Sequence, residues 1–122
     1  MSQFISLQTA IDMTSLYRSQ RENILKPEFQ NQAILALSEA FDRTVFDAVL
    51  AESGCQGLRI YYGMSADLKV HAIIVGVDEN GNDILPSANA AAATEGEEDD
   101  GYIIENANRC PPICPGDSPL NS

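Results

Sequence analysis

The clearest pattern of apolar and polar positions lies in the middle of the chain, where it has the period of a β-strand. Residues 58–62 and 70–77 are rich in the β-branched and aromatic residues that strands favour. Asn80-Gly81 follows the second run and predicts a tight hairpin turn, because both residues tolerate a positive φ. A third strand begins at residues 84–85 and ends at the proline that follows. We therefore predict an antiparallel β-meander.

Apolar residues recur at helical spacing before the meander. Over residues 6–25 they fall near one face, with the Ser6 hydroxyl as N-cap. Pro27 ends this helix, because the residue before a proline is disfavoured in the α region. The short apolar run 33–37 is either a strand or the start of a longer helix. We favour a strand, since Asp42 is suited to cap a separate helix.

The second predicted helix runs over residues 43–52. Its inward apolar side chains are expected to be Val45, Phe46, Val49 and Leu50. Gly54 is a good terminator, because glycine adopts a positive φ without strain. Two helices that cover one face of the meander would give a two-layer α+β domain over residues 1–86.

An alanine-rich and then acidic stretch, residues 87–100, follows this domain. It cannot bury enough apolar area to fold, so we predict a flexible linker. Residues 101–122 are the third part, a short C-terminal strand followed by a tail rich in cysteine and proline. The strand-like residues 102–105 are predicted to pair with a free edge of the meander, in the same chain or in a neighbouring copy.

The charge balance narrows the function classes. The chain has 122 residues, 18 acidic and 7 basic, and a net charge of −11. This charge argues against nucleic acid, which needs clustered Lys and Arg, and against anionic membranes. No targeting pattern is visible, and three cysteines, an odd number, fit a reducing compartment, so we expect a cytoplasmic protein. Without a catalytic triad pattern, a phosphate-binding glycine loop or an HExxH motif, we expect no enzymatic activity.

Several short motifs occur together in the second half of the chain: Gly54-Cys55, GLRIYYG at 57–63, VGVD at 75–78, DILP at 83–86 and CPPICP at 110–115. In this combination the chain resembles a group of small uncharacterised proteins of Bacteroidota bacteria, which also tend to end in a Cys-Pro-Pro-x-Cys-Pro element. The resemblance covers most of the chain from Asp42 onward. It implies a bacterial cytoplasmic protein and brings no catalytic residues, because no activity is assigned to the group.

The cysteines are the first candidates for site chemistry. Cys110 and Cys114, with Cys55 and His71, would make a Cys3His zinc set if the tail folds back onto the meander. A reversible disulfide between Cys110 and Cys114 is an alternative to zinc. The simplest interpretation is a proline-stiffened tail with reduced thiols, in which Cys55 is a small buried apolar residue.

A second candidate site lies on the meander. Arg59, Tyr61 and His71 are predicted to form a polar cluster that binds an anion or another small ligand, provided that the faces of their strands coincide. The alternative is that these residues are the solvent-facing half of an antiparallel sheet.

The leading hypothesis is a non-enzymatic protein that contacts another protein or its own copies through its C-terminal segment. The predicted contact residues are Tyr102, Ile103, Ile104, Cys110, Pro111, Pro112, Ile113 and Cys114. A linker of this length lets the segment pair with its own sheet or with a neighbour's, and an exchange that does not close produces filaments. The alternative hypothesis is a regulatory domain that binds a small ligand or zinc.

Overall fold

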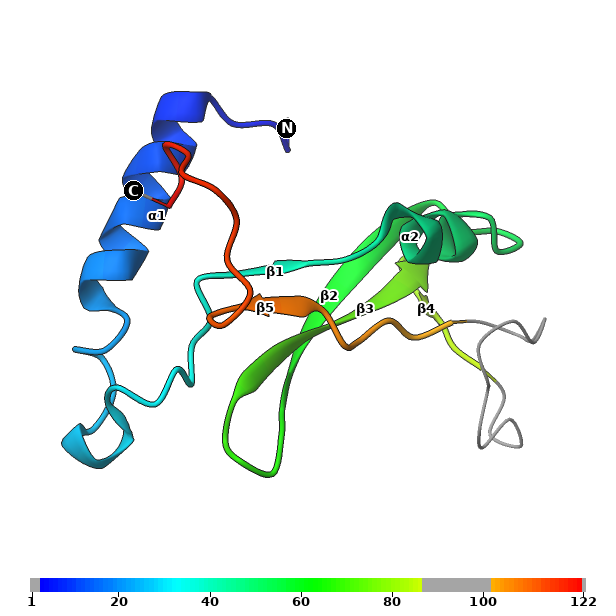
Figure 1. The fold of residues 1–122 in the computed structure, drawn as a ribbon. Coiled ribbons are helices and arrows are strands. Elements are labelled where there is room, and N and C mark those ends of the chain that lie inside the picture. The colour runs from blue at the N-terminus through cyan, green and yellow to red at the C-terminus, as the bar shows by residue number, and fades with distance from the viewer. Residues whose placement is uncertain (1–2, 87–101, 122) are drawn as a thin grey trace.

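The computed structural model describes residues 3–86 and 102–121, which form an α+β fold (Figure 1). In chain order its elements are α1 (Leu7–Gln20), the short 3-10 helix η1 (Pro27–Phe29), β1 (Ser38–Ala40), α2 (Arg43–Leu50), β2 (Gly57–Met64), β3 (Val70–Val77), β4 (Asp83–Ile84) and β5 (Asn108–Cys110). The predicted linker, residues 87–100, lies outside the described residues. Within the described ranges, no helix has the length and apolar character needed to cross a membrane.

Strands β2, β3 and β4 form the antiparallel meander that the sequence predicts. β2 and β3 pair over their whole length, from Gly57 opposite Val77 to Met64 opposite Val70. β4 pairs only with the end of β3, so most of the outer edge of β3 is left for other partners.

The turn between β3 and β4 differs in detail from the prediction. Gly81 adopts a φ of 82°, whereas Asn80 does not adopt a positive φ. The carboxylate of Asp78 accepts hydrogen bonds from the N–H groups of Asn80 and Asn82, each at 2.9 Å. This aspartate therefore stabilises the turn, and only the glycine adopts the left-handed conformation.

A second, two-stranded sheet joins β1 to β5, which lies close to the C-terminal end of the chain (Figure 1). The strand predicted at residues 33–37 is wrong, because β1 begins only at Ser38. Ala33 adopts a φ of 55°, which interrupts any extended strand. This apolar run nevertheless contributes a buried side chain, that of Ile34.

Helix α1 begins as predicted and ends earlier. The Ser6 hydroxyl accepts a hydrogen bond from the Thr9 N–H at 3.0 Å, so Ser6 is the N-cap. The helix stops at Gln20 rather than at residue 25. The two residues that follow contact the next loop instead, as Arg21 donates to the Leu35 carbonyl at 2.5 Å. Pro27 opens η1 and does not itself terminate α1.

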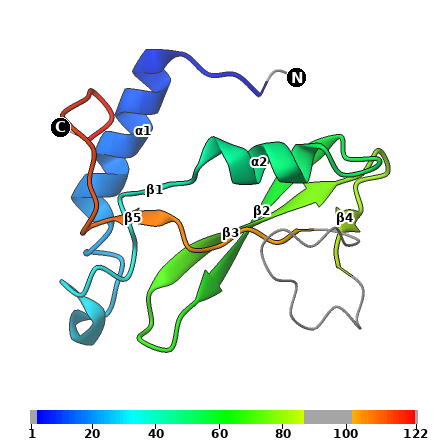
Figure 2. The ribbon, with the colours of Figure 1, turned by 45° about the vertical axis from the view of Figure 1, so that its right-hand side comes forward.

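Within residues 3–86 and 102–121, α2 alone covers the meander, so the predicted packing of both helices on one face is wrong. α1 stands beside the second sheet, away from the meander, in both ribbon views (Figures 1 and 2). One of the bonds that hold it there runs from the Tyr17 hydroxyl to the Ala36 carbonyl at 2.5 Å. The apolar spacing of α1 predicts a helix correctly, but it does not identify the surface that the helix contacts.

Helix α2 packs on β3 and forms the core of the fold. Val49 is completely buried and contacts Ile74 of β3 and Ile104 of the C-terminal segment. Gly76 allows this close approach, since a Cβ there would lie 3.3 Å from the Val49 side chain. α2 ends at Leu50, two residues earlier than predicted, and Gly54 follows with a φ of 79°.

Candidate functional site

The C-terminal segment covers part of the outer edge of β3. Ile104 forms an antiparallel bridge with Ile74, and the N–H of each residue donates to the carbonyl of the other at 2.9 Å. The Ile104 side chain belongs to the core, and Tyr102 packs against it. The predicted strand over residues 102–105 is not formed, but Ile104 pairs with the chain's own sheet rather than with a neighbour's, one of the two arrangements that the sequence allows. Ile103 points away from the core and is exposed.

A buried arginine covers the next part of the same edge. Arg109 is 8% exposed; its Nε donates to the Val70 carbonyl at 3.1 Å and its Nη2 to the Ile34 carbonyl at 2.7 Å. A guanidinium is stable in the interior only when its N–H groups find acceptors, and these two carbonyls supply them. The burial of Arg109 is not predictable from the sequence, because a single arginine beside Cys110 forms no pattern that signals burial.

Glu39 of β1 occupies the remaining position between these two contacts. Its Oε2 accepts a hydrogen bond from the Ala72 N–H at 3.0 Å. Its Oε1 is buried without a hydrogen bond and lies 3.9 Å from Nδ1 of His71. The same histidine nitrogen lies 3.5 Å from Oε1 of Glu105. The outer edge of β3 is thus covered by side chains and main-chain groups from the C-terminal segment and from β1.

β2 is the other edge of the meander, and within the described residues no strand pairs with its outer side. In an antiparallel pair the N–H and C=O of one residue point to the same side, and the direction alternates along the strand. Ile74 directs its two groups toward Ile104. Ile60, opposite Ile74, therefore directs its own groups toward the free side of β2. The same alternation applies to the outward groups of Leu58, Tyr62 and Met64.

These four residues also expose their side chains. We call Leu58, Ile60, Tyr62 and Met64 the edge stripe. Opposite residues of a sheet share a face, so the edge stripe lies on the face that α2 covers. α2 packs on β3, however, and all four side chains of the edge stripe remain exposed. The stripe combines unpaired main-chain groups with uncharged, mostly apolar side chains.

The opposite face of β2 has the predicted polar residues, with one difference. The Arg59 guanidinium and the Tyr61 hydroxyl both donate to the carboxylate of Asp83 on β4, and Arg59 also reaches the Gly81 carbonyl at 3.0 Å. The hydrogen bond from Tyr61 and that from Arg59 lower the pKa of Asp83, and the bond to Asp83 raises the pKa of Tyr61. His71 shares this face but lies opposite Gly63, farther along β2, and does not join the cluster.

The predicted zinc set is not assembled. Cys110 and Cys114 form a disulfide with a Cα–Cα distance of 4.7 Å. Cys55 is a free thiol that packs against the core. Among the described residues, no three histidine, cysteine, aspartate or glutamate side chains are grouped so that they could hold a metal ion.

The rest of the tail forms a turn around this disulfide. The peptide bonds that precede Pro111 and Pro112 are cis. The Ile113 N–H donates to the Arg109 carbonyl at 2.9 Å, while the Ile113 side chain is exposed. Of the predicted contact residues, Tyr102, Ile104 and Cys110 are therefore used inside the chain, and Ile103 and Ile113 face outward.

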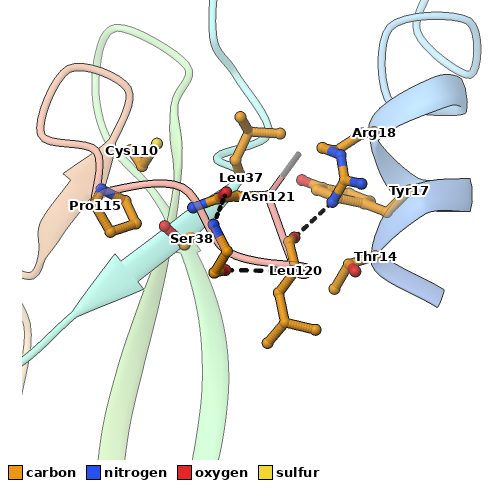
Figure 3. Close-up of a pocket in the computed structure, with 10 residues that line it drawn as sticks. Thr14, Tyr17, Arg18, Leu37, Ser38, Cys110, Pro115, Leu120 and Asn121 are labelled. Atoms are coloured by element: carbon orange, nitrogen blue, oxygen red, sulfur yellow. Dashed lines mark hydrogen bonds between the residues drawn. The ribbon is translucent and has the colours of Figure 1, made fainter. Parts of the chain in front are cut away.

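A pocket of about 280 Å³ lies between α1 and the end of the tail (Figure 3). Tyr17 and Arg18 line it from the helix, and Leu120 lines it from the tail. Arg18 donates to the Leu120 carbonyl at 2.5 Å, and Asn121 accepts a hydrogen bond from the Ser118 N–H at 2.8 Å. These bonds fold the tail over the helix and form one wall of the pocket. Of the lining residues, Cys110 is among the predicted site residues, whereas Tyr17, Arg18 and Leu120 are not predicted from the sequence.

Comparison with protein-family models, with curated proteins and with solved structures finds no match to this chain.

Proposed function

We propose that this chain is a non-enzymatic protein that works through protein–protein contact and associates with its own copies. The observation that carries the proposal is the outer side of the eight-residue strand β2, with which no strand pairs among the described residues and where the edge stripe is exposed. Long, apolar edge strands without protection are templates for pairing with another chain. The predicted cytoplasmic location is part of this proposal.

The sequence alone favours the C-terminal segment as the main contact with a partner. In this proposal the segment is a secondary contact. Ile104 and Arg109 complete the chain's own core and sheet edge, so their exchange with a neighbour would require the monomer to open first. Of the predicted contact residues, Ile103, Pro112, Ile113 and Cys114 are exposed and remain available to a partner. The segment is therefore a secondary contact candidate, and the β2 edge is the primary one.

The proposal is tested by the mass of the full-length protein in solution, measured by light scattering after gel filtration over a wide concentration range. The expected result is a species heavier than the 13.2 kDa chain that increases with concentration. A 13.2 kDa monomer at every concentration would overturn the proposal. Deletion of the C-terminal segment is unsuitable for this test, since it would remove Ile104 from the core.

A second candidate function, binding of a small ligand, has one supporting observation, the pocket between α1 and the tail. Its lining is mostly apolar with a few polar groups, as in many ligand sites, and its volume is near the lower end of the usual range. The Arg59–Asp83 ion pair is weaker support, because Arg59 already has two acceptors. A thermal-shift screen of small metabolites against wild type and a Thr14→Trp variant tests this candidate. Hits that stabilise wild type alone would support it.

A further inference from the structure

Other segments of the chain cover the outer side of β3, whereas the outer side of β2 is left open. The outer side of β3 is closed by Ile104, Glu39 and Arg109, which reach it from the C-terminal segment and from β1. β2 has few of the devices that protect edges: Gly57–Met64 contains no proline, lysine or carboxylate, and its one charged residue, Arg59, is bonded to Asp83 on the face opposite the edge stripe. β2 and β3 also pair in register along their length without an extra residue. The open side of β2 is therefore a template for pairing with a strand of another chain.

We propose that two copies of this chain pair antiparallel through their β2 strands, with a two-fold axis at Tyr61. This inference rests on the self-association proposed above and names its interface. In this register Leu58 of one copy lies opposite Met64 of the other, and Ile60 lies opposite Tyr62. The outward main-chain groups of the two strands then meet and form about eight hydrogen bonds. The two three-stranded meanders become one continuous sheet.

The alternation of outward and inward main-chain groups along β2 restricts the register of this pairing. A shift by one residue would place outward N–H and C=O groups against inward ones and would put the edge stripe on the opposite face from its copy. A shift by two residues places the axis at Ile60 and still brings outward main-chain groups opposite outward ones. It leaves Met64 opposite Gln56, however, which lies outside the strand. The axis at Tyr61 is therefore the one that pairs the whole edge stripe with itself.

Charge also favours a second copy as the occupant. The four residues of the edge stripe carry no charge, so pairing them with their copies brings no like-charged side chains of the stripe together. On the other face Arg59 would lie opposite Gly63 of the second copy, where no side chain obstructs it, and diagonal to its Tyr61. That tyrosine is bonded to Asp83, so the arginine of each copy approaches the tyrosine and carboxylate of the other.

Disulfide cross-linking tests the register in full-length protein from which the free thiol has been removed by Cys55→Ala. Tyr61 pairs with itself across the axis at a position without main-chain hydrogen bonds, where Cα atoms lie about 4.5 Å apart, within disulfide range. Tyr61→Cys is expected to form a covalent dimer on mild oxidation, with the 61–61 link identified by peptide mass spectrometry. Ile60→Cys and the control Leu85→Cys are expected to yield at least about tenfold less. Efficient cross-linking of Ile60→Cys instead would place the axis at Ile60 and overturn the proposed register.

A matched pair of lysine substitutions tests the surface independently. Ile60 and Ile103 are 53% and 52% exposed, so lysine at either position is compatible with the folded monomer. Ile60→Lys places two ammonium groups in the proposed interface and is expected to weaken association on the order of a hundredfold. Ile103→Lys is expected to leave it unchanged. Circular dichroism establishes that both variants fold.

The outcomes separate the interface from the proposed function. A wild-type chain that stays monomeric overturns both. An associated wild type that Ile60→Lys does not dissociate overturns the β2 interface and leaves self-association standing. Dissociation by Ile103→Lys alone would identify the C-terminal segment as the contact and would also overturn the β2 interface.

Discussion

Ile74 and Ile104 exchange two main-chain hydrogen bonds of 2.9 Å, although residues 87–101 separate β4 from the C-terminal segment. The same two side chains enclose Val49 of α2. Ile104 of the C-terminal segment thus bridges to the edge of the sheet and completes the core beneath α2. The C-terminal segment is a structural part of the fold, and this placement leads to the first prediction.

Ile104→Ala is expected to destabilise the protein by about 2–4 kcal/mol, because it opens a cavity beside Val49 and Ile74. Ile103→Ala, one position away on the exposed side, is expected to change stability by less than about 0.5 kcal/mol. Urea unfolding followed by circular dichroism measures both. Equal effects for the two variants would show that Ile104 does not belong to the core.

Arg109→Met removes two hydrogen bonds and leaves the Val70 carbonyl without its side-chain donor. The expected loss of stability is about 1–3 kcal/mol, since a buried polar group loses its partner. Arg109→Lys should recover only part of this, because one ammonium does not reproduce the guanidinium fork. The control is Arg43→Met on the exposed surface of α2, where the loss should be below about 0.5 kcal/mol. A loss at Arg109 no larger than at Arg43 would contradict the assigned role.

The Cys110–Cys114 disulfide makes a prediction about thiol accessibility. Of the three cysteines, Cys55 alone should react with an alkylating reagent in denaturant without reductant. Reduction is expected to lower stability by about 2 kcal/mol, the chain-entropy value for a loop this short. Cys114→Ala should remove the sensitivity to reductant, whereas Cys55→Ala should retain it. Alkylation of all three cysteines in freshly prepared, unreduced protein would contradict the disulfide.

Substitution of the carboxylates of Asp83 and Glu52 is expected to change the stability of the folded state in opposite directions. The hydrogen bonds from Tyr61 and Arg59 lower the pKa of Asp83, so its ionised form stabilises the folded state. That contribution is present above the unfolded pKa of about 4 and is lost as the pH falls through the folded value. Burial raises the pKa of Glu52, opposed in part by the Tyr102 backbone, and both carboxylate oxygens are buried without a well-formed hydrogen bond. Glu52 therefore favours folding when protonated, and this advantage is lost as the pH rises through its folded pKa.

Thermal melts over a pH series check these two signs. Asp83→Asn should lower the melting temperature at neutral pH, and the difference from wild type should shrink as the pH falls below the unfolded pKa of about 4 and through the lower folded pKa. Glu52→Gln should raise the melting temperature at neutral pH, because it removes a poorly solvated charge, and its advantage should also vanish in acid. Effects of the same sign for the two variants at neutral pH would refute this assignment.

The sequence predicts the local parts of this fold better than its long-range contacts. The alternation over residues 58–62 and 70–77 predicts the meander, because strand periodicity and turn chemistry are both local. The pairing of β1 with β5 is not predictable in the same way, since each strand has only three residues and their partners are far apart in sequence. Arg109 and Glu39 are missed for a related reason: charged residues usually lie at the surface, and only the assembled fold provides the carbonyls and N–H groups that bind them.

In the candidate site, too, the features that depend on local sequence are predicted and those that depend on long-range contacts are not. Arg59 and Tyr61 are correctly placed on one face, because β2 alternates regularly. Their acceptor Asp83 is missed, since its position depends on the β4 register. The edge stripe is visible in the sequence as alternating apolar residues, but that pattern alone predicts burial under a helix. Its exposure follows from α1 lying elsewhere, and no local feature of α1 signals this.

Amide hydrogen exchange of the full-length protein, resolved by residue and recorded at several protein concentrations, tests the central claim most directly. The outward N–H groups of Leu58, Ile60, Tyr62 and Met64 are predicted to become protected as the concentration rises. The N–H groups of Arg59 and Tyr61, which face β3, are predicted to be protected at every concentration. If the four outward groups exchange rapidly at all concentrations while the protein associates, the pairing of β2 strands is contradicted.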